Sequence, residues 1–370
     1  MTVTLDAADK AVPHFFPAGA VAATTPYGSG KVNDTFLVRV TGNDQVFLLQ
    51  HLSRLAFPRP ELVMANLRLV CDHVAAKMAR ELTADSRWEM VTVRPALSGA
   101  DCWFDEQGDC WRVLHLIDNT VCVETVENIG QAREIGFALG RFHELISDLD
   151  PNRLADTLPG FHVTPGYLAR YDRVRQSPAA LRASGAACSF CRQFIDRRRR
   201  GVAVLEEAAA QGRIVLRPIH GDPKPSNVLF DKESGRAVSL IDLDTVKPGL
   251  LLYDLGDCLR ACCNRGGEED EGAVLFDADL CRAVLQGYGE AARVGLGRGD
   301  VDLLFDATRL IALELGIRFF IDHLEGDPYF KTAYAGQNLE RALVQFRLVA
   351  SIEEQEASIR AMARELEQRR

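Results

Sequence analysis

Residues 219–257 read IHGDPKPSNVLFDKESGRAVSLIDLDTVKPGLLLYDLGD, a pattern typical of a polar loop followed by a β-hairpin. Two short apolar runs, 228–230 and 237–241, flank the link DKESGR at 231–236. Apolar runs on either side of a turn-rich link pair as antiparallel strands. The segment therefore predicts a hairpin whose open end meets the polar loop at 220–227.

Three polar side chains gather at the open end of this hairpin. Asn227 enters the first strand and Asp242 leaves the second, so the two are expected to lie together. One oxygen ligand from each, beside nucleotide phosphates, is an arrangement that Mg²⁺ uses. Asp222 lies five residues before Asn227, in a loop whose flexibility is limited by Pro223 and Pro225. A carboxylate held there can orient an attacking hydroxyl, so the pattern predicts phosphoryl transfer.

An ordinary hairpin is the simpler explanation to set against this one. Turn-forming Asp and Asn residues often cap hairpins, which would explain any single one of these side chains. It does not explain a histidine and three such residues in one register, namely His220, Asp222, Asn227 and Asp242. The spacing of Asp222 and Asn227 also equals that of the catalytic Asp and metal-binding Asn of protein kinases.

The same segment resembles the aminoglycoside phosphotransferase and choline kinase superfamily, whose fold is similar to that of the protein kinases. The resemblance implies ATP as phosphoryl donor, Asp222 as catalytic base, and Asn227 and Asp242 as ligands of Mg²⁺. It also implies that His220 and Asp254 brace the catalytic loop. The implied fold is α+β, protein-kinase-like and bilobal, with a small β-rich N-terminal lobe and a larger, mostly helical C-terminal lobe.

Further runs are similar to one branch of this superfamily, the N-acetylhexosamine 1-kinases. They are IDLDTV at 241–246, FLLQ at 47–50, ELGIRFF at 314–320 and GDPYFK at 326–331. This similarity implies an N-acetylhexosamine as acceptor. It also implies phosphorylation at the anomeric hydroxyl, which gives a sugar 1-phosphate.

A glycine-containing loop, GSGKVNDT at 28–35, precedes the first pair of predicted strands. Glycines let backbone N–H groups approach phosphate oxygens closely. The loop has neither the Walker A pattern nor the third glycine of a Rossmann fingerprint. We predict nucleotide contacts from Gly28, Gly30, Asn33 and Thr35.

The superfamily usually places a phosphate-binding lysine on the third strand, where this chain has Gln50. The hexosamine-kinase branch also looks lysine-free at this position, so the departure fits the branch. Gln50 is therefore predicted to contact the nucleotide. The cation that would bind the phosphates is left open among Lys31, His51 and Arg54.

Three charged residues share one face of a predicted helix, because Glu314, Arg318 and Asp322 follow one another at i, i+4 spacing. A surface ion-pair ladder has the same spacing, but apolar residues surround much of this helix. Enclosed carboxylate and guanidinium groups suit a ligand with many hydroxyls. We predict the acceptor site from Glu314, Arg318, Asp322 and Tyr329, together with Asp222.

Hydrophobic periodicity and β-propensity predict the remaining elements. Strand-like runs occupy residues 32–40, 45–49, 88–97 and 111–117. Helical patterns occupy residues 60–82, 128–146, 190–210 and most of the chain from 302 onward.

Composition limits the class and the partners of the chain. Its 370 residues, 47% hydrophobic and 26% charged, are enough for two lobes. We place a nucleotide-binding lobe at 1–118 and a catalytic and substrate-binding lobe at 119–370. A formal net charge of −9 argues against nucleic acid and anionic membranes as partners. Because the sequence shows neither a secretory signal nor an apolar run of membrane length, a cytoplasmic protein is expected. The oligomeric state is not indicated.

Two other functions are compatible with the sequence. A kinase of another sugar, an aminoglycoside or an amino alcohol would use the same catalytic residues, although cationic acceptors call for a strongly acidic pocket. A nucleotide-binding pseudokinase would account for Gln50. Pseudokinases typically lose the catalytic Asp or a metal ligand, however, and Asp222, Asn227 and Asp242 are all present.

Overall fold

The computed structural model describes residues 3–28, 32–42, 45–80, 87–269, 272, 274–293 and 295–368. The chain forms two compact units. The first consists of Met1–Thr120 with Ala155–Leu158, and the second of Val121–Leu154 with Pro159–Arg370. The units thus change over after Thr120, where the short strand β7 (Thr120–Val121) lies. Within the described residues, no helix combines the length and apolarity needed to cross a bilayer.

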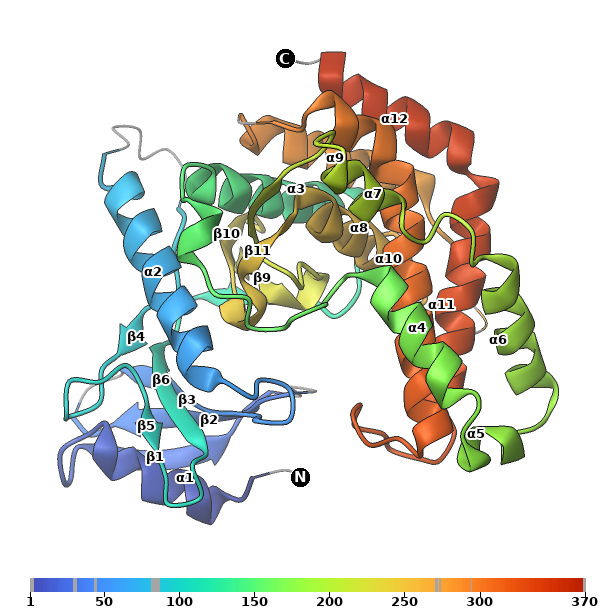
Figure 1. Ribbon diagram of the computed structural model, residues 1–370. Coiled ribbons are helices and arrows are strands. Elements are labelled where there is room, and N and C mark those ends of the chain that lie inside the picture. Colours follow the sequence, from blue (N-terminus) through green and yellow to red (C-terminus); the bar gives the residue numbers. More distant parts are fainter. Residues whose placement is uncertain are drawn as a thin grey trace. The chain divides into compact units, whose positions relative to one another are not determined.

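The first unit is built on an antiparallel sheet with the strand order β1-β2-β3-β6-β4, and β5 pairs with β6 (Figure 1). The strands are β1 (Val21–Pro26), β2 (Asp34–Val40), β3 (Val46–Leu52), β4 (Val93–Arg94), β5 (Trp103–Phe104) and β6 (Cys110–His115). The predicted hairpin over 32–49 is confirmed as β2 and β3. The predicted strand at 88–97 is wrong except for β4, because Pro95 has no N–H to continue the ladder.

The two faces of this sheet differ in character. Alternate residues of β2, β3 and β6 form an apolar core with α1 (Leu5–Ala11) and the 3₁₀ turn η1 (Val12–His14). The core side chains from the sheet are Phe36, Val38, Phe47, Leu49, Trp111 and Val113. The alternating register places Thr35, Gln50 and Arg112 in one cross-strand row on the other face. The first unit also contains α2 (Pro60–Met78), whose Met64 Sδ lies 4.0 Å from Arg112 Nη1.

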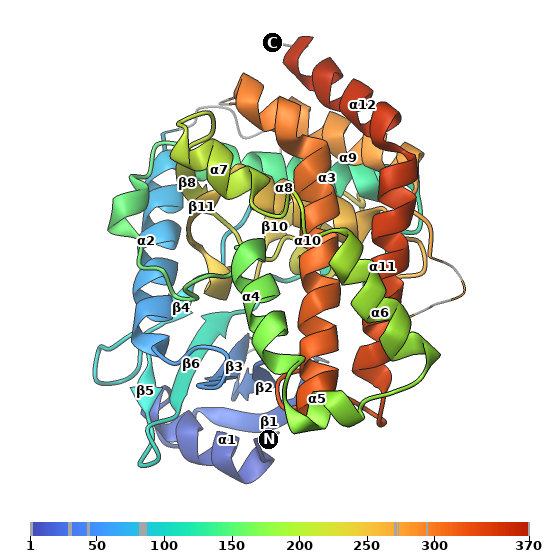
Figure 2. The ribbon, with the colours of Figure 1, turned by 45° about the vertical axis from the view of Figure 1, so that its right-hand side comes forward.

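The second unit is mostly helical. Its helices are α3 (Ile129–Ile146), α4 (Thr164–Val174), α5 (Pro178–Arg182), α6 (Ala186–Arg197), α7 (Val204–Ala210), α8 (Leu251–Cys262), α9 (Ala278–Ala291), α10 (Arg298–Glu325), α11 (Gln337–Glu354) and α12 (Glu356–Gln368). Figures 1 and 2 show α10 running beside α11, and α10 also packs against α4, α8 and α12. The single helix predicted over 190–210 is instead α6 and α7. The chain breaks between them at Gly201, whose φ is +78°.

Two antiparallel strand pairs frame the loop that carries the polar motif. The pair β9 (Val228–Asp231) and β10 (Ala237–Leu240) is the predicted hairpin. The Ile241 N–H donates to the Asn227 carbonyl at 2.8 Å, so Asn227 and Asp242 do meet at its open end. The second pair, β8 (Leu216–Ile219) and β11 (Lys247–Leu250), flanks this hairpin in the sequence. Residues 220–227 therefore run from the end of β8 to the start of β9, ending in the 3₁₀ turn η3 (Pro225–Asn227).

Glycines allow α3 and α9 to touch backbone to backbone. A Cβ on Gly136 of α3 would lie 1.9 Å from the Val284 carbonyl oxygen of α9. A Cβ on Gly287 of α9 would lie 1.9 Å from the Arg133 carbonyl oxygen of α3. Real carbon and oxygen atoms do not approach this closely, so any larger residue must separate the helices.

We therefore expect Gly136→Ala to destabilise the protein by overpacking, by about 1–3 kcal/mol in the free energy of unfolding. Equilibrium urea denaturation measures this change. Gly166→Ala is the matched control, because Gly166 lies in the first turn of α4 with open space around it. The control should change the free energy of unfolding by no more than about 1 kcal/mol. Equal stabilities of the two variants would contradict the close contact of α3 and α9.

Candidate active site

A buried carboxylate on α8 holds the loop that carries Asp222. Asp254 is fully buried, and its two oxygens accept the N–H groups of His220 and Gly221, each at 2.7 Å. His143 of α3 adds a third contact, with Nε2 2.8 Å from Asp254 Oδ2. Burial alone would raise the pKa of Asp254, but the hydrogen bond and charge of His143 and the backbone hydrogen bond of His220 hold it below its usual value. An ionised acceptor thus fixes the start of the loop that carries Asp222.

His220 connects this loop to the β9–β10 hairpin. Its Nε2 lies 2.9 Å from the Ile241 carbonyl oxygen, which can only accept, so Nε2 carries a proton. Its Nδ1 accepts the N–H of Asp222 at 3.2 Å and must carry a lone pair. The ring is therefore neutral, in keeping with burial, which lowers the pKa of His220. These contacts are the bracing that the resemblance implied for His220 and Asp254.

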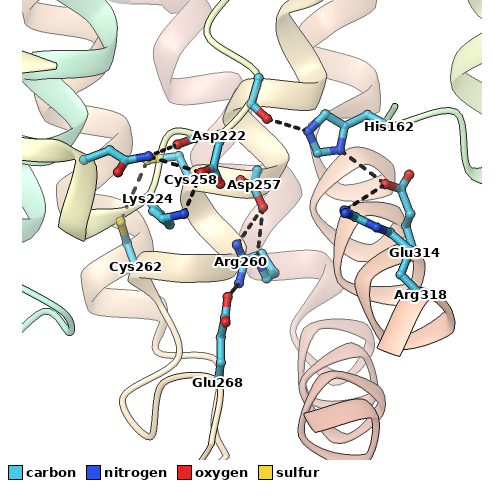
Figure 3. Close-up of polar contacts among 12 residues, drawn as sticks. His162, Asp222, Lys224, Asp257, Cys258, Arg260, Cys262, Glu268, Glu314 and Arg318 are labelled. Atoms are coloured by element: carbon cyan, nitrogen blue, oxygen red, sulfur yellow. Dashed lines mark hydrogen bonds and ion pairs between the residues drawn. The ribbon is translucent and has the colours of Figure 1, made fainter. Parts of the chain in front are cut away.

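Asp222 is surrounded by two donors from its own loop. Lys224 Nζ lies 2.5 Å from Asp222 Oδ2. Asn227 Nδ2 donates to the Asp222 carbonyl at 2.7 Å and lies 3.2 Å from Oδ2. Burial alone would lower the pKa of Lys224, but the carboxylates of Asp222 and Asp242 outweigh it and hold that pKa above its usual value. The loop therefore places an ammonium group against the Asp222 carboxylate, and Figure 3 shows Lys224 pointing toward Asp222.

The open end of the hairpin offers oxygen donors of the kind that Mg²⁺ prefers. Because Asn227 Nδ2 faces Asp222, the amide oxygen Oδ1 is the atom left to act as a ligand. Asp242 has a left-handed backbone, with φ +64°, which is uncommon outside glycine. Within the described residues, no three His, Cys, Asp or Glu side chains form a metal-binding group. An amide and a carboxylate fit Mg²⁺ if nucleotide oxygens and water complete its coordination.

A second polar cluster lies on α10. Glu314 is buried and Arg318 nearly so, and Arg318 Nη1 is 4.0 Å from Glu314 Oε1. The Arg318 guanidinium lies 5.0 Å from the ring centre of Phe161, 5.4 Å from Tyr167 and 5.5 Å from Phe330. Three aromatic rings around a guanidinium form a site with both apolar and charged walls. The two residues that spacing alone placed on one helix face are thus brought together.

Asp322, one turn further along α10, has a different environment. Its carboxylate accepts the N–H groups of Tyr329 and Phe330, both at 2.9 Å, and Asn338 Nδ2 at 3.0 Å. The loop after α10 turns back at Gly326, which has φ +92°, and so presents its backbone donors to Asp322. The direct acceptor contact predicted for Asp322 stays a prediction. Its carboxylate holds the loop that carries Tyr329.

In the first unit, the predicted nucleotide residues form a short chain of contacts. Gln50 Nε2 lies 3.2 Å from Thr35 Oγ1, and Gln50 Oε1 accepts from Arg112 Nε at 2.9 Å and Nη2 at 2.8 Å. Asn33 Oδ1 accepts the Ser53 N–H at 3.0 Å. Gly28 has φ +74°, a conformation suited to glycine.

The residues suggested as phosphate-binding cations are Lys31, His51 and Arg54. Gly30 and Lys31 lie outside the described residues. His51 is close to Asp109, with Nε2 3.5 Å from Oδ2, and Arg54 donates to the Gly108 carbonyl at 3.3 Å. The cation that touches Gln50 is Arg112, which is only 2% exposed and which the sequence analysis did not single out.

Comparison with known proteins identifies the family. Residues 23–293 match the profile described as the phosphotransferase enzyme family, APH. The chain belongs to this family. A curated relative, homoserine kinase of Gluconobacter oxydans strain 621H, is 31% identical over 127 residues. That match covers 32% of this chain and only 38% of the homoserine kinase.

Solved phosphotransferase structures share the fold. The choline kinase of Cryptosporidium parvum Iowa II superposes with a TM-score of 0.60 at 11% identity, covering 93% of this chain and 92% of that chain. The ethanolamine kinase of Plasmodium vivax gives 0.58 at 10% identity, covering 90% and 82%. The predicted kinase-like α+β fold is thus confirmed.

Two residues that contact the predicted site residues were not singled out from the sequence. Lys224 had a usable signal, since it follows Asp222 by two residues between two prolines. Arg112 had none, because it meets Gln50 only through the pairing of β3 and β6.

The Asp254 contacts predict a stability change. Asp254→Asn keeps the shape of the side chain but replaces one buried acceptor with a donor that faces N–H groups. We expect a loss of about 3 kcal/mol in the free energy of unfolding, measured by urea denaturation. Asp302→Asn on the exposed face of α10 is the control and should stay within about 0.5 kcal/mol of wild type. A loss below about 1 kcal/mol in Asp254→Asn would mean that its carboxylate does not hold the loop.

Proposed function

We propose that this chain is a Mg²⁺- and ATP-dependent kinase that phosphorylates a hydroxyl group of a small molecule. The observation that carries the proposal is the geometry of one loop. Asp222 lies within hydrogen-bonding distance of Lys224 and Asn227, at the hairpin end where Asp242 also lies. Phosphoryl transfer needs positioning and charge neutralisation more than covalent help from the protein, and this loop supplies both.

Each residue of the loop has a role in the proposed reaction. The acceptor hydroxyl oxygen forms a bond to the γ-phosphorus as the bond to the β-phosphate oxygen breaks, and ADP leaves. Asp222 orients that hydroxyl and takes its proton. Lys224 stabilises the negative charge of the transferring group. Asn227 and Asp242 would hold Mg²⁺, which neutralises phosphate charge when bound.

For the nucleotide, we assign contacts to the first unit. The Arg112 guanidinium can only donate, so it orients the Gln50 amide with Oε1 toward itself and Nε2 toward Thr35. This leaves a Gln50 N–H as a neutral donor to phosphate, in the place where relatives carry lysine. Gly28, Gly30, Asn33 and Thr35 complete the proposed nucleotide site.

For the acceptor, we propose an N-acetylhexosamine that is phosphorylated at its anomeric hydroxyl. The cluster on α10 supports a neutral sugar, because aromatic rings pack against sugar rings while Arg318 and Glu314 offer hydrogen bonds to hydroxyls and to an acyl carbonyl. A cationic acceptor such as choline or an aminoglycoside would meet the guanidinium of Arg318. The similarity of the IDLDTV run to N-acetylhexosamine 1-kinases points the same way.

A hydroxyl-bearing amino acid is the second candidate acceptor. It is favoured by the partial match to a homoserine kinase and by Arg318, which can pair with a carboxylate. Homoserine therefore belongs in any panel of acceptors.

The acceptor is tested by coupled ADP release over hexosamines, other sugars, amino alcohols, aminoglycosides and homoserine, followed by phosphorus NMR of the product. We expect N-acetylglucosamine or N-acetylgalactosamine to give a 1-phosphate, whose phosphorus couples to a single anomeric proton. Turnover with homoserine or an aminoglycoside alone would overturn the sugar and keep the kinase. ATP-binding protein without turnover of any acceptor would favour a pseudokinase.

Asp222→Asn should leave ATP binding intact and lower kcat by about 10²–10⁴-fold, because the amide cannot take the hydroxyl proton. Steady-state kinetics with the best acceptor measure kcat, and calorimetry measures ATP affinity. A variant that keeps more than half of wild-type kcat would remove Asp222 from the mechanism.

Lys224→Met tests the charge placed beside Asp222. We expect kcat to fall by about 10²-fold or more, because removing one donor that stabilises developing charge usually lowers kcat by about this factor. Lys232→Met, in the exposed turn between β9 and β10, is the matched control and should behave as wild type. Equal kcat values for the two variants would exclude Lys224 from the reaction.

A further inference from the structure

One histidine of the second unit has a strained backbone and a fully enclosed ring. His162 lies in the loop before α4 with φ +66°, the left-handed region that residues other than glycine seldom adopt. Its side chain is 4% exposed. Strained, buried residues persist where their surroundings hold them, and they concentrate at functional sites.

The ring of His162 joins two elements that the proposed reaction uses. Its Nε2 lies 2.8 Å from the carbonyl oxygen of Gly221, and its Nδ1 lies 3.4 Å from Glu314 Oε1 (Figure 3). A carbonyl oxygen only accepts, so Nε2 carries a proton. A lone pair on Nδ1 would face a carboxylate oxygen, whereas a proton there is attracted to it. Nδ1 makes no hydrogen bond among the described residues, so a proton on it, which makes the ring an imidazolium, is the state that the facing carboxylate favours.

The groups around the ring agree with this charge. From α10, Glu314 is the nearest anion, and its other oxygen lies 3.3 Å from Thr164 Oγ1. From α8, the Tyr253 ring lies tilted at 36° to that of His162, with 5.7 Å between ring centres, and Asp257 adds negative charge while pairing with Arg260. Burial alone would lower the pKa of His162, but the contact with Glu314 outweighs it and holds the pKa above its usual value. The cation of Arg318, whose Nη1 lies 4.0 Å from the same Glu314 oxygen, does not reverse this direction.

The contact with Gly221 acts on the peptide bond that precedes Asp222. The oxygen of this peptide accepts from His162, and its N–H donates to His220 Nδ1 at 3.2 Å. Gly221 cannot be replaced to compensate, because a Cβ there would lie 2.6 Å from the Thr245 carbonyl oxygen. The peptide plane between Gly221 and Asp222 sets the direction of the Asp222 side chain. Two histidines hold this plane, His162 at the carbonyl oxygen and His220 at the N–H.

We propose that His162, as an imidazolium, is a positioning residue that couples the acceptor cluster on α10 to the catalytic loop. It fixes the peptide bond before Asp222 and neutralises Glu314, which leaves Arg318 available to the acceptor. The effect of His162 on catalysis rests on the proposed function. The charge state and the contacts of His162 are independent of that function.

The charge state is tested without any turnover, by ¹⁵N NMR of the histidine rings, with His162 assigned by its loss in His162→Asn. We expect both nitrogens of His162 to be protonated at pH 7 in wild type. Glu314→Gln should shift the titration of His162 to lower pH, because it removes the facing anion. A neutral His162 at pH 7, or one unaffected by Glu314→Gln, would overturn the inference.

The positioning role is tested by the kinetics of His162→Asn, since asparagine tolerates the left-handed backbone but is too short to reach both partners. We expect kcat/KM for the acceptor to fall by about 10–100-fold, as misplaced catalytic groups do, with KM for ATP within about twofold of wild type. His162→Asn with Glu314→Gln should lose less than the sum of the two single changes. The role would be refuted if the losses of the two single variants added up in the double variant, or if His162→Asn lowered kcat/KM equally for acceptor and ATP. It would also be refuted if a folded His162→Asn variant kept acceptor kcat/KM within threefold of wild type. An imidazolium in a protein that turns over no acceptor would refute the proposed function alone.

Discussion

Three donors converge on the buried carboxylate of Asp254, and the loop that carries Asp222 depends on this one cluster. The N–H groups of His220 and Gly221 and the ring of His143 all meet it at 2.7–2.8 Å. An ionised carboxylate without partners would be very costly to bury, so carboxylate and donors require each other. Because the pKa of Asp254 is lowered, this stabilisation is present above its unfolded-state value and is lost as the pH falls through the folded-state value.

Backbone strain surrounds the proposed reacting groups. Left-handed conformations occur at His162, Gly221 and Asp242, with φ of +66°, +88° and +64°. For the two residues that are not glycine, such conformations cost about 1–3 kcal/mol each. Side-chain contacts hold the first two, since His162 binds Gly221 and Asp254 binds the Gly221 N–H. A loop fixed this way needs little rearrangement before phosphoryl transfer, which is the contribution expected of a positioned site.

The sequence alone predicted what is local. Alternation and turn residues located the β9–β10 hairpin, and the hairpin then placed Asn227 and Asp242 at one end. Helical spacing likewise placed Glu314 and Arg318 on one face of α10. What the sequence analysis missed depends on contacts between distant residues. Those contacts are set by how strands and helices pack, which no local pattern records.

Three examples show this limit. Arg112 meets Gln50 across 62 residues of chain, and His162 meets Gly221 across 59. Asp322 accepts the N–H groups of the loop after α10, a contact that helical spacing could not show. Lys224 differs, since it lies inside the motif itself and its ion pair with Asp222 is local.

The loop that carries Asp222 is held in place by Asp254 in the free protein, and amide hydrogen exchange measures how firmly it is held. The N–H groups of His220 and Gly221 donate to Asp254, so they should exchange only through global unfolding. Their exchange free energies should then equal the free energy of unfolding from urea denaturation. If these two amides exchanged as fast as that of Glu233, in the exposed turn between β9 and β10, Asp254 would not hold the loop in place.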